Sequence, residues 1–135
     1  MVVARKIAEI RARVARVREL LPPSAADFVT GGTATEALIL NLYLALQATS
    51  DLALHAVADR GLGVPGDARA AFQVLGTTGL VPPALVTRLS AAVGMRNRIA
   101  HQYGDMDLAL VYAAARDGVE DLTTFAAEMA RAYGL

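Results

Sequence analysis

Apolar residues recur at helical spacing from the beginning of the sequence. The spacing is 4-3-4-3-4, set by Val3, Ile7, Ile10, Val14, Val17 and Leu21. Such a pattern forms one narrow apolar stripe along a helix. Pro22 and Pro23 follow, and proline cannot continue a helix. The stripe is similar to a coiled-coil seam, but the apolar segments that follow offer a nearer partner, so we expect this helix to pack within a bundle.

Further helices are expected along the rest of the chain. A long second helix should begin near Thr33, with Glu36 completing a capping box, and end at Arg60. Its part 37–46 is apolar almost all round, which is typical of a central helix or a dimer interface.

The second half predicts one short helix and two long ones. The short helix covers 67–75 and is closed by Gly76, and the next runs from Pro83 to about residue 103. The last should be capped by Asp105 or Asp107, reach residue 132, and be weakened at Gly118. With no alternating β pattern, the sequence predicts one all-α domain over 1–135, an up-and-down bundle of four long helices and one short helix.

Composition narrows the setting of this bundle. Hydrophobic residues make up 55% of the 135 residues and mean hydropathy is +0.40, so we expect oligomerisation, most simply a homodimer. The chain has no cysteine, and charge appears at Arg5 and Lys6 before any signal-like apolar run, so we expect a cytoplasmic protein. The longest apolar run is about half of the ~20 residues that a membrane span needs, so we expect no membrane association.

Charge is unevenly distributed although the net charge is zero. Bases outnumber acids in the first 20 residues, and acids outnumber bases after Gly104. The basic end either contacts a polyanion or is an ordinary solvated helix face.

Chemically versatile side chains are concentrated between residues 96 and 103. This stretch contains two guanidinium groups, a carboxamide, an imidazole and a phenol, supplied by Arg96, Arg98, Asn97, His101 and Tyr103. At about 100° per residue, Tyr103, Asn97 and His101 project within about 140° of Arg96, along or beside the stripe buried one turn earlier. Arg98 projects about 200° away from Arg96, so its side chain should be exposed to solvent. From this exposed position it is a candidate contact for the RNA backbone.

Polar groups beside a buried face allow two interpretations. In the first, Arg96 bonds a carboxylate such as Asp51 and His101 caps helix carbonyls. In the second, the face opens into a cleft where arginine stabilises a phosphate and histidine transfers a proton, which suits RNA cleavage without a metal. Asn97, four residues before His101, would then fix the imidazole ring. Because the only histidines are His55 and His101, we expect neither a metal site nor a cofactor.

The second helix carries a polar line at four-residue spacing, formed by Tyr43, Gln47, Asp51 and His55. These side chains either face the site or bond one another. Asp51 either forms an i,i+4 pair with His55 or orients a catalytic group from the facing helix.

The order Arg96-Asn97, three residues, His101, one residue, Tyr103 resembles the motif of the HEPN superfamily, and its His-x-Tyr ending is similar to the HepT branch. The supporting context is residues 26–30, Asp51 and His55, residues 60–63, and the short helix before residues 81–82. The resemblance implies a homodimeric helical bundle acting as a metal-independent ribonuclease.

The same resemblance implies specific roles for these residues. Arg96 and His101 would be catalytic and Asn97 supporting. A minimal nucleotidyltransferase of the MntA type would act as antitoxin, transferring AMP onto Tyr103. The alternative is a non-catalytic binding or dimerisation module that serves only as partner or AMP acceptor of such an enzyme.

Overall fold

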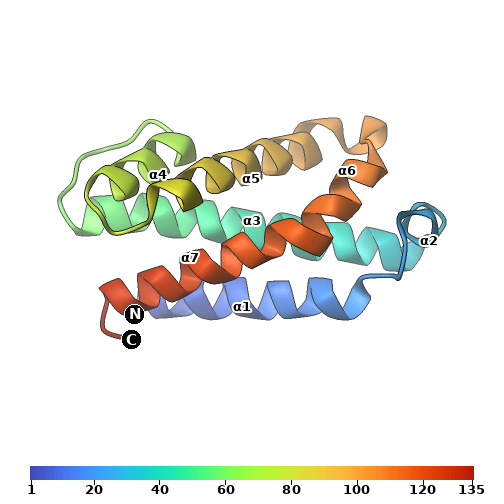
Figure 1. Cartoon of the computed structure of the whole chain (residues 1–135), viewed down its shortest axis with the longest axis horizontal. Helices are drawn as coiled ribbons and strands as arrows, with labels where there is room; N and C mark the ends of the chain where they lie inside the picture. The colour runs from blue at the N-terminus through green and yellow to red at the C-terminus, as the bar shows by residue number, and fades with distance from the viewer.

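Four long helical rods lie side by side in the structure, a computed structural model that describes residues 1–135 (Figure 1). The elements in chain order are α1 (Val2–Leu20), α2 (Ala25–Val29), α3 (Thr33–Asp59), α4 (Ala68–Thr77), α5 (Pro83–Gln102), the 3₁₀ turn η1 (Tyr103–Asp105), α6 (Leu108–Ala113), the π-helical turn η2 (Ala114–Gly118) and α7 (Val119–Ala132). α6, η2 and α7 together form the fourth rod. The predicted all-α bundle is therefore confirmed, with α4 as its short helix.

The apolar stripe of the first helix is buried as predicted. Its buried positions are Val3, Ile7, Ile10, Val14 and Val17, and the helix ends at Leu20, ahead of Pro22. α1 packs mainly on α3 and next on α7, so the stripe faces a bundle core within the chain.

α3 is the central helix of the bundle. It is long and apolar enough to cross a membrane by length and composition alone, yet 61% of its most apolar window is buried within the protein. The predicted capping box does not form. The helix begins after Gly32, whose φ is +57°, so Thr33 already lies inside the first turn and its side chain caps nothing.

Both α4 and the fourth rod begin with a side-chain cap, of which only the cap by Asp107 was predicted. Asp67 accepts the N–H of Ala70 at 2.9 Å, and Asp107 accepts the N–H of Ala109 at 3.0 Å. The sequence predicted that Gly76 ends this helix, but α4 continues to Thr77. Gly76 lies inside the helix, where a Cβ would stand 2.7 Å from Cγ2 of Val86, so it allows α4 to approach α5 closely.

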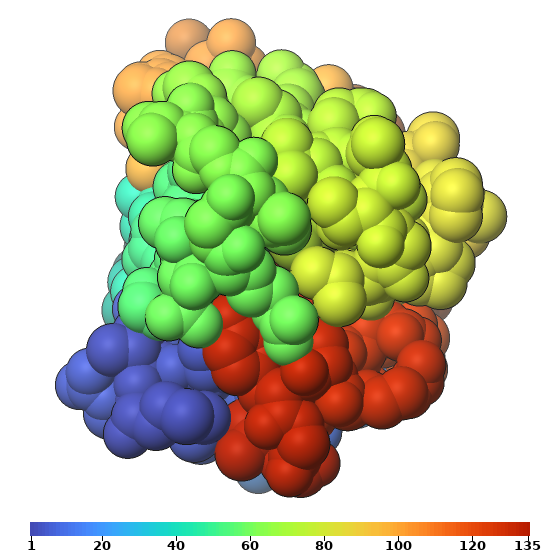
Figure 2. Space-filling view, turned by 90° about the vertical axis from the view of Figure 1, so that its left-hand side faces the viewer, coloured from blue at the N-terminus to red at the C-terminus, as the bar shows by residue number.

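The two ends of the bundle are closed differently. At one end the short α2, which was not predicted, buries Phe28, and the Tyr112 hydroxyl donates to the carbonyl of Pro22 at 2.9 Å. At the other end the α3–α4 connection, green in Figure 2, lies above the blue and red terminal segments. One continuous apolar core extends from Val3 to Ala130 and fixes the relative positions of the four rods.

Candidate functional site

The polar motif occupies the last two turns of α5. Leu85, Leu89 and Val93 are buried, as predicted, and they fix the rotation of the helix. Arg96 and Asn97 follow on the half-buried side, whereas Arg98 is exposed, as the helical projection predicted.

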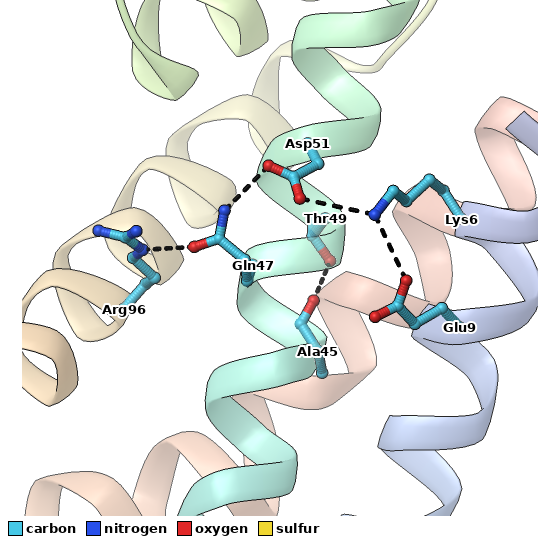
Figure 3. A network of polar contacts seen from close by, with 7 residues as sticks. All are labelled: Lys6, Glu9, Ala45, Gln47, Thr49, Asp51 and Arg96. Atoms are coloured by element: carbon cyan, nitrogen blue, oxygen red, sulfur yellow. Dashed lines mark hydrogen bonds and ion pairs between the residues drawn. The ribbon is translucent and has the colours of Figure 1, made fainter. Parts of the chain in front are cut away.

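A chain of polar contacts connects Arg96 to two other helices (Figure 3). Its Nε donates to Oε1 of Gln47 at 2.8 Å, and Nε2 of Gln47 donates to Oδ1 of Asp51 at 2.9 Å. Nζ of Lys6 on α1 lies 3.6 Å from Oδ2 of Asp51 and 3.4 Å from Oε2 of Glu9. The amide of Gln47 is thus oriented at both ends, because its oxygen faces a cation and its nitrogen a carboxylate.

A second amide completes the fixation of the Arg96 guanidinium. Nη1 donates to Oδ1 of Asn97 at 3.1 Å, and Cζ lies 5.7 Å from the ring centroid of Tyr43. Nη2 has no hydrogen-bond partner in the protein, and Figure 3 shows the terminal nitrogens pointing away from Gln47. An oriented guanidinium with unused donors is suited to binding a phosphate or carboxylate.

Three of the predicted contacts are different in the structure. Asn97 contacts Arg96 and makes no hydrogen bond to His101. Asp51 bonds Gln47 and Lys6, so neither the expected pair with His55 nor a direct contact with Arg96 forms. Asp51 therefore acts on Arg96 only through Gln47, and His55 makes no hydrogen bond.

His101 and Tyr103 are exposed, although the projection placed them along the buried side. Tyr103 retains 53% of its exposure, and neither side chain makes a hydrogen bond, so His101 does not cap helix carbonyls. Tyr103, but not His101, borders a groove between α3 and α5. The groove, of about 380 Å³, is lined by Leu40 and Tyr43 of α3 and by Ala100 and Tyr103.

A pocket of about 230 Å³ adjoins the half-buried part of the motif. It is lined by Gln47, Asp51, Arg96 and Asn97, together with Arg69 from α4. The sequence analysis identified neither Arg69 nor Lys6. One signal was present: Gly94 lies in the interior of α5, where glycine usually has a packing or functional reason.

Apart from Lys6, which pairs with the pocket residue Asp51, the cations of the first helix and Arg98 do not contact this pocket. Of the six bases in the first helix, Lys6, Arg13, Arg16 and Arg18 have polar partners in the protein, which favours a structural role for most of that face. Arg98 borders a different groove between α5 and the fourth rod. Arg96 and Arg98 thus serve different surfaces of one helix.

The chain is similar in sequence and in fold to known toxins of toxin–antitoxin pairs. The sequence model of the family described as "Ribonuclease HepT-like" matches residues 10–129. The mRNA nuclease HepT of Shewanella oneidensis is 28% identical over 124 residues, covering 92% of each chain. A crystal structure of an MntA–HepT toxin–antitoxin mutant superposes with a TM-score of 0.88 at 27% identity, covering 97% of this chain and 99% of that one. The tri-AMPylated S. oneidensis HEPN toxin in complex with the MNT antitoxin gives 0.87 at 27% identity, covering 96% and 97%.

Proposed function

This chain belongs to the HepT-like ribonuclease family, and from that premise we propose that it is the toxin of a toxin–antitoxin pair, an endoribonuclease that needs no metal. The observation that carries the proposal is that one helix presents both a fixed guanidinium and an imidazole that makes no hydrogen bond within the chain. Arg96 is held by Gln47 and Asn97 with donors to spare, and His101 follows five residues later on the exposed continuation of the same helix.

These groups can perform internal transesterification. The ribose 2′-oxygen bonds to the adjacent phosphorus while the bond from phosphorus to the 5′-oxygen of the next nucleotide breaks, leaving a 2′,3′-cyclic phosphate and a 5′-hydroxyl. His101 takes the 2′-hydroxyl proton, and an imidazolium returns a proton to the leaving 5′-oxygen. Arg96 stabilises the charge that develops on the phosphate oxygens. Asn97 and, through Gln47, Asp51 position that guanidinium.

We propose a homodimer with the groove between α3 and α5 at its interface. Leu40 and Tyr103, which line this groove, are 57% and 53% exposed, so the groove leaves apolar surface uncovered two residues along the chain from His101. A second copy seated on this groove would cover the apolar side chains and bring two His101 side chains to one cleft.

The proposed partner is a nucleotidyltransferase antitoxin that modifies Tyr103. The free phenol oxygen would attack the α-phosphorus of ATP, releasing diphosphate and its own proton and forming a tyrosyl–AMP ester. Bulk and negative charge two residues from His101 would then block the place where RNA phosphate binds. Arg98, on the other side of α5, is proposed to contact the RNA backbone outside the cleft, and the cytoplasm is the proposed location.

Incubation of purified protein with total RNA in EDTA tests the nuclease assignment. The wild type should degrade RNA and His101→Ala should not, with the cyclic phosphate detected at the new 3′ ends. Equal decay with both proteins contradicts the assignment. No decay with either protein favours the alternative, a non-catalytic binding or dimerisation module. Size-exclusion chromatography of both proteins shows whether His101 instead maintains the dimer.

Co-expression with a nucleotidyltransferase of the MntA type tests the modification. Intact-mass analysis should show added AMP on the wild type and none on Tyr103→Phe, while Tyr103→Phe still cleaves RNA. Tyr133→Phe is the matched control and should still be modified. Added mass that persists in Tyr103→Phe would reject Tyr103 as acceptor.

A further inference from the structure

Two arginines from different helices line the pocket beside the motif. Arg96 comes from α5 and Arg69 from the first turn of α4, and the pocket of about 230 Å³ lies between them and α3. They meet because α4 packs against both α3 and α5, beside which it lies in Figure 1.

The carboxylates of this pocket are engaged, whereas each of the two arginines keeps donors that bond nothing in the protein. Asp51 accepts from Gln47 and pairs with Lys6, and Asp67 caps α4 by accepting the N–H of Ala70. Arg69 has no hydrogen bond or ion pair in the protein, and Nη2 of Arg96 is likewise unused. The charged donors left over in the pocket therefore come from two guanidinium groups, which favours an anionic occupant.

Gly94 keeps the place that Arg69 occupies open. A Cβ on Gly94 would stand 3.3 Å from Nη2 of Arg69, which is the only atom near it. Glycine is unfavourable in a helix interior, so its presence in α5 calls for a reason, and the guanidinium lying over it supplies one. Gly94, Asn97 and His101 share one face of α5, and Gly94 precedes His101 by about 10 Å along the axis.

We propose that Arg69, together with Arg96, forms a second phosphate-binding subsite that holds the RNA backbone one nucleotide away from the bond that is cleaved. It rests on the proposed function, because it assigns RNA as the anion. Arg96 faces both phosphates, His101 serves only the cleaved one, and Arg69 serves only the neighbouring one. Backbone contacts of this kind are insensitive to base sequence and sensitive to salt.

Binding of an RNA oligonucleotide that cannot be cleaved isolates the subsite from catalysis. The probe is a fluorescent 2′-O-methyl decamer, measured by anisotropy at several salt concentrations in the His101→Ala protein. Adding Arg69→Gln should weaken binding roughly tenfold, the order of one charge-assisted contact. It should also reduce the slope of log affinity against log salt by about 0.7, the value for one phosphate on a single strand.

Three further variants make the assignment specific. Arg69→Lys keeps the charge and should retain the salt slope. Gly94→Ala keeps both charges but displaces the Arg69 guanidinium, so it should weaken binding less than Arg69→Gln does. Arg131→Gln on α7 removes one charge elsewhere and should change neither affinity nor slope. An unchanged slope in Arg69→Gln, or an equal loss in Arg131→Gln, overturns the subsite.

Cleavage assays distinguish failure of the subsite from failure of the nuclease assignment. A dinucleoside monophosphate has no neighbouring phosphate, so Arg69→Gln should cleave it like the wild type, whereas KM for a decaribonucleotide should rise with kcat unchanged. An equal loss on both substrates overturns the subsite but leaves the nuclease intact. If the wild type cleaves neither RNA while Arg69 still sets the salt slope, the subsite stands and the nuclease assignment fails.

Discussion

The Arg96 end and the His101 end of the motif lie on one helix but are held in different ways. Arg96 is fixed by two amides and is connected, through Gln47 and Asp51, to side chains of two other helices. His101 and Tyr103, five and seven residues later, are exposed and make no side-chain hydrogen bond or ion pair with the chain. The chain alone thus orients Arg96, the proposed anion-binding residue. It leaves His101 and Tyr103, the proposed proton-transfer group and AMP acceptor, accessible to other molecules.

The comparison predicts that stability and activity separate along the motif. Loss of an oriented guanidinium lowers the cleavage rate by about 10²- to 10³-fold, so Arg96→Lys should show this loss and should also lower the unfolding midpoint, because an ammonium cannot bond Gln47 and Asn97 together. His101→Asn should lose about 10²- to 10⁴-fold in rate with an unchanged midpoint. Single-turnover cleavage and thermal unfolding of both variants check this, and equal shifts in midpoint would contradict the comparison.

Gln47 should be the most sensitive position outside the motif. Gln47→Leu removes the acceptor of Arg96 and the donor to Asp51 at a half-buried site, which should cost about 1–3 kcal/mol in the free energy of unfolding. Cleavage should fall with KM nearly constant, since the guanidinium remains but loses its orientation. A double-mutant cycle with Arg96→Lys measures the coupling. Additive losses would show that Gln47 does not position Arg96.

The smallest effect is expected at the far end of the network. Lys6 is 30% exposed and Asp51 39%, and their charges are 3.6 Å apart. A pair this solvated contributes about 0–1 kcal/mol, so Lys6→Met should change urea unfolding by no more than that and leave the cleavage rate unaltered. The difference between variant and wild type should shrink in high salt. If Lys6→Met lowered the cleavage rate more than Gln47→Leu does, Lys6 on α1 would be the main residue that positions Arg96.

The helical periodicity of the sequence correctly predicted which faces of α1 and α5 are buried, but not which residues the polar side chains bond. The stripe of α1 and the buried face of α5 follow from the positions of apolar residues alone, because a helix turns by a constant angle. Asp51 shows the limit: Gln47 lies four residues before it and His55 four residues after it, and on an isolated helix the two are equivalent neighbours. Arg96 and Lys6, which come from other helices, decide between them.

The role of Arg69 could not be predicted from the sequence because it too depends on a contact between two helices. Its place over Gly94 depends on how α4 docks against α5, and that docking rests on the close approach at Gly76. The exposure of His101 likewise depends on how far α3 and α5 stay in contact. Angular position on a helix gives the direction of a side chain but not the distance to whatever lies opposite.

The burial of α3 by α1 also bears on how the protein is made. Synthesis delivers α1 to the exit of the ribosome before α3, and domains begin to organise from the N-terminus as they emerge. The helix with the length and hydropathy of a membrane span therefore emerges after the amphipathic helix that is its main packing partner. Because α1 is synthesised first, an apolar face of α3 has its packing partner available before α4, α5 and α7 are made.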